Sequence, residues 1–324
     1  MTKIPRLYVA MLRYRVATMV ALFMLIGAAR EGRLELGARY VFAAVALASS
    51  YVAATALNDL ADEEIDKVNH PLDAGRPLVD GSATRGDLLM LHVLAAVAAL
   101  LAAVPLGARA VGLIAAALAI SQAYSARPVR LSYRVAGAPL ALGLAYVLVP
   151  YLLGIVAAGG DLRHAGSQLT GALFLLFCAR IVLKDFRDRE GDARYGKPTI
   201  LLRFGKTATC ATSLCALAAG DAVLALALDP VLALLVQPFV LAIAAMLRTL
   251  WRAEDTRAEQ VAIGIGARMG NGLLLGVLAW LVAKGGGASV AEASLLTGAL
   301  GAVFFLGFAS LAARPQQAVI GYKG

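Results

Sequence analysis

Residues 37–66 read GARYVFAAVALASSYVAATALNDLADEEID, an apolar run that leads directly into a cluster of carboxylates. Between residues 37 and 57 the only charged side chain is Arg39. The run has the length of roughly 20 residues that a helix needs to cross the hydrocarbon core of a bilayer. It therefore predicts a membrane-spanning helix that ends where the carboxylates begin.

Comparable apolar runs recur along the whole chain. They cover residues 12–29, 37–57, 87–107, 109–124, 136–158, 168–184, 207–228, 230–248, 262–283 and 290–312. In the composition 60% of the residues are hydrophobic and 16% are charged, against about 45–50% and about 25% in a soluble domain. We therefore expect one all-α domain over residues 1–324, a polytopic membrane protein with a bundle of nine or ten transmembrane helices around a central cavity.

The net charge of +9 is explained by membrane topology. If the N-terminus is cytoplasmic, most of the 30 Lys and Arg fall on the cytoplasmic side, as the positive-inside rule requires. We therefore expect an integral protein of the inner or plasma membrane with a cytoplasmic N-terminus. No basic stripe with interleaved aromatic residues remains, so nucleic acid is not an expected partner.

The first carboxylate cluster lies at the end of the apolar run over residues 37–57. If the helix continues, Asp59, Asp62 and Asp66 stand at i, i+3 and i+7 and share one face. Three like charges on one face repel each other, and a divalent cation would relieve this repulsion. Hard oxygen ligands without a neighbouring His or Cys cluster favour Mg²⁺ over zinc.

A second cluster repeats this spacing with Asp185, Asp188 and Asp192, after the run over residues 168–184. The turns that follow the two clusters are also related, with the sequences GRP at residues 75–77 and GKP at residues 196–198. This pattern indicates two four-helix-like repeats whose acidic edges face each other. Because Mg²⁺ commonly completes its ligand shell with substrate phosphates, a diphosphate is the expected ligand between the edges.

These motifs resemble the UbiA superfamily of intramembrane prenyltransferases. Residues 58–66 are similar to its Asn-Asp-x-x-Asp-x-x-x-Asp motif, residues 188–192 to its Asp-x-x-x-Asp motif, and residues 124–131 to its Tyr-Ser loop. The resemblance implies about nine transmembrane helices and transfer of a polyprenyl group from a prenyl diphosphate to an acceptor, with Mg²⁺ as cofactor.

The mechanism that the resemblance implies, together with the place of basic residues in loops beside the two clusters, gives individual residues expected roles. The expected catalytic residues and Mg²⁺ ligands are Asp59, Asp62, Asp66, Asp185, Asp188 and Asp192. The expected substrate-binding residues are Asn58, Arg13, Arg76, Tyr124, Ser125, Arg127, Arg130, Lys184 and Lys197. Asp188 is in addition a candidate base for the acceptor. Arg180 and Arg268 lie inside apolar runs, and such residues generally face a bundle interior or a wet cavity.

The sequence leaves the acceptor open. Residues 184–192 are similar to homogentisate prenyltransferases and chlorophyll synthases, which favours an aromatic or quinone-precursor acceptor. Residues 66–77 are similar to the archaeal geranylgeranylglyceryl phosphate synthase branch, which favours a lipid-like one. The expected partners are thus a prenyl diphosphate donor, an aromatic or lipid-like acceptor and membrane lipid.

A UbiA-type terpene cyclase is the alternative function. It would ionise the same diphosphate but let the cation close on its own double bonds. Its pocket should be aromatic and dry, whereas a transferase pocket should hold polar groups for an acceptor. The aromatic content of 7% slightly favours transfer.

Overall fold

The helices of the protein follow the apolar runs. The computed structural model describes residues 3–32, 34, 37–71, 75–164 and 166–312, and within them every regular element is a helix. The α-helices are α1 (Lys3–Met11), α2 (Tyr14–Arg30), α3 (Ala38–Asn69), α4 (Arg85–Ala103), α5 (Ala108–Ser125), α6 (Gly137–Gly143), α7 (Val149–Ala157), α8 (Ser167–Ile181), α9 (Arg189–Arg194), α10 (Ile200–Ala227), α11 (Pro230–Arg252), α12 (Thr256–Gly285) and α13 (Val290–Ala312).

The all-α membrane fold is confirmed. Within the described residues, 8 helical segments are long and apolar enough to span a membrane, or up to 9 if α1 and α2, which meet at a bend of 70°, form one span. Helix α8 has only 15 residues because the chain tightens into the 3₁₀ turn η5 (Val182–Phe186). The expected total of nine or ten transmembrane helices stays a prediction.

The two acidic clusters differ in local structure although their spacing is the same. Helix α3 continues past the apolar run to Asn69 and carries the whole first cluster, with a break at Asp62 (φ −112°, ψ 17°). In the second cluster, Asp185 lies in η5, Asp188 precedes α9 and Asp192 lies within α9. The repeated spacing therefore does not produce a repeated helix face.

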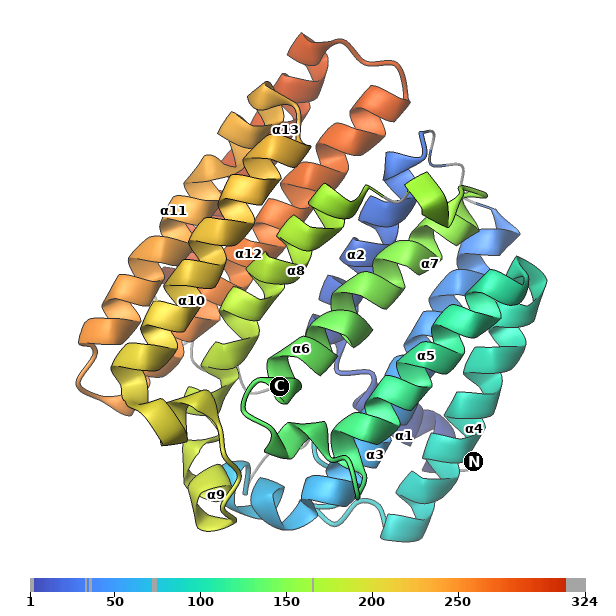
Figure 1. The fold of residues 1–324 in the computed structure, drawn as a ribbon, viewed down its shortest axis with the longest axis vertical. Coiled ribbons are helices and arrows are strands. Elements are labelled where there is room, and N and C mark those ends of the chain that lie inside the picture. The colour runs from blue at the N-terminus through green and yellow to red at the C-terminus, as the bar shows by residue number, and fades with distance from the viewer. Residues whose placement is uncertain (1–2, 33, 35–36, 72–74, 165, 313–324) are drawn as a thin grey trace.

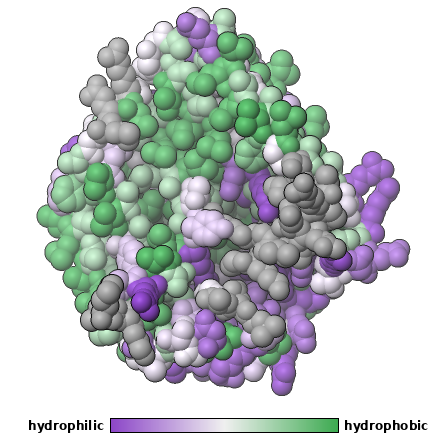
Figure 2. All heavy atoms as spheres, turned by 180° about the vertical axis from the view of Figure 1, so that it is seen from behind, coloured by the Kyte–Doolittle hydropathy of each residue, from purple (hydrophilic) through white to green (hydrophobic). Residues whose placement is uncertain are grey.

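The helices surround an interior space, and the segments with the carboxylates lie at one end of it. Figure 1 shows α9, the C-terminal end of α3 and the start of α4 together at the lower end of the bundle, with α10 to α13 at one side and α3 to α5 at the other. Helix α2 contacts both α7 and α12 and so joins the two sides. Figure 2 shows that hydrophilic residues gather toward this lower end, whereas hydrophobic residues dominate the upper part of that face.

One helix is irregular where it lines the interior. Between α6 and α7 the chain forms a π-helical turn, η3 (Leu144–Leu148). Such turns are frequent at functional sites. Here the turn contributes Ala145 and Tyr146 to the wall of the interior cavity.

Helices α2 and α7 cross at two glycines. A Cβ at Gly27 would lie 2.0 Å from the carbonyl oxygen of Tyr151, and one at Gly154 would lie 1.9 Å from that of Met24. The two backbones are thus in direct contact, as in membrane helices that associate through small residues.

We expect Gly154→Ala to destabilise the protein, because the new methyl group can be accommodated only if α2 and α7 move apart. Overpacking of this kind costs about 1–3 kcal/mol. The loss of stability would be measured by thermal unfolding of the detergent-solubilised protein. Gly112→Ala in α5 is the matched control, since a Cβ there meets no atom within 4 Å. An unchanged unfolding temperature for Gly154→Ala would contradict this close contact.

Candidate active site

A cavity of about 740 Å³ runs from the carboxylate end into the bundle. Its inner walls are largely apolar, with Met19, Leu47, Phe177, Ile243 and Leu247 among the lining residues. The charged and amide side chains that line it are Arg13, Asn58, Arg76, Arg180, Lys184, Arg187, Asp188, Arg268 and Asn271, and hydroxyl groups, among them those of Tyr124 and Ser125, line it as well. The cavity can therefore hold a molecule with an anionic head and a hydrocarbon tail.

The first carboxylate cluster is buried and neutralised by cations from other segments. Asp59 accepts hydrogen bonds from Arg13, at 2.7 Å to each carboxylate oxygen, and from Arg76 at 2.9 Å. The same nitrogen of Arg76 also donates to Asp66. All three aspartates of this cluster are at most 6% exposed. A single arginine from the loop before α4 thus holds two predicted metal ligands together.

Asp62 lies at the centre of the site. It accepts hydrogen bonds from Arg130 at 3.2 Å, Lys197 at 3.2 Å and Asn58 at 3.3 Å. These three groups come from three different segments of the chain. The break of α3 at Asp62 accompanies this convergence.

In the second cluster, Asp188 lies closest to the large cavity and is held as a carboxylate. Its Oδ1 is 3.1 Å from Arg187 and 3.3 Å from His70. Burial alone would raise the pKa of Asp188. The charge of Arg187 and the hydrogen bond from His70 outweigh this effect and hold that pKa well below its usual range. Asp188 is therefore a weak base, which argues against its expected role in deprotonating the acceptor.

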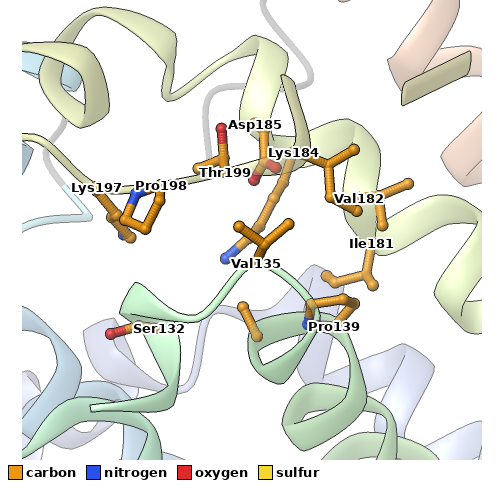
Figure 3. A pocket seen from close by; sticks show the side chains of 12 residues that line it. Ser132, Val135, Pro139, Ile181, Val182, Lys184, Asp185, Lys197, Pro198 and Thr199 are labelled. Atoms are coloured by element: carbon orange, nitrogen blue, oxygen red, sulfur yellow. The ribbon is translucent and has the colours of Figure 1, made fainter. Parts of the chain in front are cut away.

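Asp185 faces a separate pocket of about 20 Å³, which has room for one water molecule. Figure 3 shows Asp185 near Lys184, with Lys197 across the pocket and Ser132 and Pro139 below. Burial raises the pKa of Asp185 to about 7.

Lys197 joins the two clusters. Its Nζ lies 3.2 Å from Asp62 and 3.5 Å from Asp192. Burial alone would lower the pKa of Lys197. Asp62 and Asp192 outweigh this effect and raise that pKa, so the ammonium group is charged. Two aspartates that are 130 positions apart in the sequence thus share one cation.

A backbone contact holds the two acidic segments side by side. The amide of Gly191 in α9 donates to the side chain of Asn69 at 2.6 Å, at the end of α3. A Cβ at Gly191 would lie 2.7 Å from the carbonyl oxygen of Ile65, so only glycine allows this approach. The sequence analysis assigned no role to Asn69 or His70, because nothing local indicates a partner more than 100 residues away.

Glu259 is a further missed residue. It is 6% exposed and accepts hydrogen bonds from Arg189 of α9 at 2.6 Å and from Lys206 of α10 at 2.8 Å. Glu259 belongs to α12, so this network ties α9, which follows directly on Asp188, to two long helices. It positions the second cluster without lining the cavity.

The expected substrate-binding residues fall into two groups. Arg13, Asn58, Arg76, Tyr124, Ser125 and Lys184 line the large cavity. Lys184 donates to the hydroxyl of Tyr124 at 2.9 Å. Arg130 and Lys197 reach the site through Asp62. Arg127 is exposed and outside the cavity lining, so its phosphate contact has no support in the structure.

The donor set suits Mg²⁺ in its chemistry. Within the described residues, no three His, Cys, Asp or Glu side chains are arranged to hold a metal ion, because aspartate oxygens contact guanidinium and ammonium groups. These oxygens are hard donors that already bind cations at the interface of the two clusters. Mg²⁺ needs only one or two carboxylates if substrate phosphates complete its shell.

Comparisons with known proteins give a matching family model and a sequence relative. The family model of the UbiA prenyltransferase family matches residues 16–272. A digeranylgeranylglyceryl phosphate synthase from Methanopyrus kandleri is 32% identical over 212 residues, which cover 62% of this chain and 70% of that protein.

Solved structures show the same fold. A structure from work on digeranylgeranylglyceryl phosphate synthase in membranes is 16% identical, with a TM-score of 0.66 over 87% of this chain and 99% of that one. A UbiA homologue from Archaeoglobus fulgidus bound to DMAPP and Mg²⁺ is 17% identical, with a TM-score of 0.59 over 96% of this chain and 98% of that one.

Proposed function

This chain belongs to the UbiA prenyltransferase family, and we propose that it binds a prenyl diphosphate with the diphosphate at the two acidic clusters and the tail along the apolar cavity walls. It is an integral membrane prenyltransferase. The observation that carries the proposal is the bridge by Lys197, which joins Asp62 of the first cluster to Asp192 of the second. Asn58, which donates to Asp62, and Asp188 of the second cluster line the cavity of about 740 Å³.

The six aspartates of the two clusters are the proposed ligands of Mg²⁺. When bound, Mg²⁺ neutralises the diphosphate and makes it a better leaving group. Arg13 and Arg76 line the cavity beside the first cluster and are placed to donate charge-assisted hydrogen bonds to phosphate oxygens. Lys184 contributes from the opposite cluster.

The proposed reaction is a substitution at C1 of the prenyl group. The C1–O bond breaks, and its electron pair leaves with the diphosphate. An oxygen or carbon nucleophile of the acceptor supplies the pair for the new bond to C1, and the acceptor's proton goes to the departing diphosphate. Tyr124 lines the cavity beside Lys184, where its ring can stabilise the allylic cation through its π face.

Polar groups in the inner wall favour transfer over cyclisation. Arg180, Arg268 and Asn271 line the cavity on α8 and α12. A cyclase needs an apolar wall that cannot quench its cation, whereas a transferase needs polar contacts for an acceptor. We therefore retain the cyclase only as an outcome that the experiment below would detect.

We propose a lipid-like acceptor with a free hydroxyl group. The relative from Methanopyrus kandleri carries the name of a digeranylgeranylglyceryl phosphate synthase, and the similarity of residues 66–77 to that branch supports the same class here. The aromatic acceptor expected from residues 184–192 is the second acceptor class to test.

The positive-inside rule supports an orientation with the acidic clusters and the N-terminus in the cytoplasm. Donor and Mg²⁺ would then enter from the aqueous side, while the prenyl tail and a lipid-like acceptor enter from the bilayer.

The proposed function can be tested with purified protein in detergent. Geranylgeranyl diphosphate and Mg²⁺ are incubated with and without a geranylgeranylated glycerol phosphate or hydroxybenzoate, and organic extracts are analysed by mass spectrometry. We expect an adduct with an acceptor and none in EDTA. A cyclic hydrocarbon or alcohol formed without acceptor would establish a cyclase, and failure to release diphosphate from any donor would refute the proposal.

A further inference from the structure

Two arginines of the candidate site have an unusual backbone conformation. Within the described residues, Arg13 (φ 42°) and Arg130 (φ 39°) are the two non-glycine residues with positive φ. Arg13 pairs with Asp59 of the first cluster. Arg130 pairs with Asp62 of the same cluster. A non-glycine residue in this left-handed region costs free energy and persists only where the surrounding structure fixes it, often at a functional site. The contacts of each arginine must therefore compensate for this cost.

The guanidinium of Arg130 lies over an aromatic ring that no step of the proposed reaction uses. Its Cζ is 3.8 Å from the centroid of the Tyr133 ring. For comparison, the Cζ of Arg203 lies 5.6 Å from the ring centroid of Phe204, which is 59% exposed. A distance of 3.8 Å places the planar guanidinium on the face of the Tyr133 ring, where a cation and an aromatic ring attract each other.

The local fold brings these two side chains together. Arg130 directly precedes the 3₁₀ turn η2 (Leu131–Tyr133), and the amide of Tyr133 donates to the carbonyl oxygen of Arg130 at 2.9 Å. Side chains at i and i+3 lie one above the other in a 3₁₀ turn. The spacing of the two residues and the turn between them therefore place the ring beside the guanidinium.

The guanidinium of Arg130 also reaches the break in α3. Its Nη2 donates to the carbonyl oxygen of Ala61 and to Oδ1 of Asp62, each at 3.2 Å. Arg130 thus binds both the backbone and a side chain of α3 at the point where the helix departs from helical geometry. A stacked guanidinium keeps its N–H groups in its own plane, so the ring can fix Arg130 without competing for these hydrogen bonds.

We propose that Tyr133 is a positioning residue for prenyl transfer. Its ring holds the guanidinium of Arg130 in place, and Arg130 in turn holds Asp62 where the two acidic clusters meet. This inference rests on the proposed function, in which Asp62 takes part. Tyr133 is outside the lining of the large cavity, so it acts through Arg130 and not by contact with a substrate.

A double-mutant cycle tests the proposal by activity. Tyr133→Leu should lower kcat/KM for the donor about 3- to 10-fold, the range that the loss of one cation–π contact gives. Tyr133→Phe keeps the ring and should stay within about twofold of the wild type. In the background of Arg130→Met, Tyr133→Leu should lower kcat/KM by less than about twofold, because the group that the ring positions is already absent.

The same cycle in thermal unfolding needs no turnover. In EDTA, Tyr133→Leu should lower the unfolding temperature of the wild type more than that of Arg130→Met, since only the wild type loses the stacking contact. Phe204→Leu is the matched control, because Phe204 contacts an arginine at the exposed surface and should change neither measurement. If Tyr133→Leu does not fold, Tyr133→Met takes its place, since it also lacks the ring.

Two results would overturn the inference while leaving the proposed function intact. One is an equal loss on Tyr133→Leu in the wild type and in Arg130→Met, which would show that the ring only packs η2. The other is a loss for Tyr133→Phe as large as that for Tyr133→Leu, which would assign the effect to the hydroxyl group. Failure of the wild type to release diphosphate from any donor would refute the proposed function, and the unfolding cycle would still decide whether the ring holds Arg130.

Discussion

Asp62→Ala should lower the rate of prenyl transfer by at least about 100-fold at saturating Mg²⁺, more than removal of a supporting contact would. Asp62 accepts hydrogen bonds from Asn58, Arg130 and Lys197, so its loss removes a proposed ligand and also leaves Arg130 and Lys197 with less countercharge. The measurement is the rate of adduct formation by mass spectrometry.

Glu64→Ala is the control for this variant. Glu64 lies on the same helix two residues away, but its side chain is 62% exposed and pairs with Lys67. Removing it should change the rate less than twofold, since exposed ion pairs contribute little. Retention of more than about a third of the wild-type rate by Asp62→Ala would contradict the central place of Asp62 in the site.

Lys197→Met should destabilise the protein strongly in EDTA. Removing one member of a buried ion pair costs about 3–5 kcal/mol, because the remaining charge has no partner. Here Asp62 keeps Arg130 and Asn58, so the cost should lie near the lower limit of this range. A divalent cation can take the place of the ammonium, so Mg²⁺ should raise the unfolding temperature of the variant more than that of the wild type.

Thermal unfolding in EDTA and in Mg²⁺ measures both effects. Lys67→Met is the matched control, because Lys67 is 44% exposed and pairs with Glu63 and Glu64 at the surface. Its unfolding temperature should be unchanged. An equal response of Lys197→Met and the wild type to Mg²⁺ would show that Lys197 does not stand where the cation binds.

Hydropathy predicted the membrane helices well because burial in lipid requires long apolar runs. It did not predict helix ends that carry polar residues. Helix α3 extends to Asn69, past its last apolar residues, because intrahelical hydrogen bonds and ion pairs from other segments stabilise its acidic end. Hydropathy also did not predict that α8 is short and continues into a 3₁₀ turn, because apolar residues occur in both α-helical and 3₁₀ geometry.

The aspartates of the candidate site were predicted from the sequence, and the structure added the contacts that hold them together. The aspartates and the cations around them could be found from spacing and from the family motifs. Glu259 and the contact of Asn69 with Gly191 could not, because each depends on how distant helices pack. Arg127 lies in the matching loop with an exposed side chain, and its phosphate contact stays a prediction.

The pairing of each acidic cluster with internal cations also bears on biogenesis. A chain that depends on a metal for its structure stays unfolded until the metal arrives. Here Arg13, Arg76, Arg130 and Lys197 form ion pairs with Asp59, Asp62, Asp66 and Asp192 inside the protein. A newly inserted chain can therefore close this end of the bundle before it encounters any substrate, and its assembly in the membrane does not have to wait for supplies of donor.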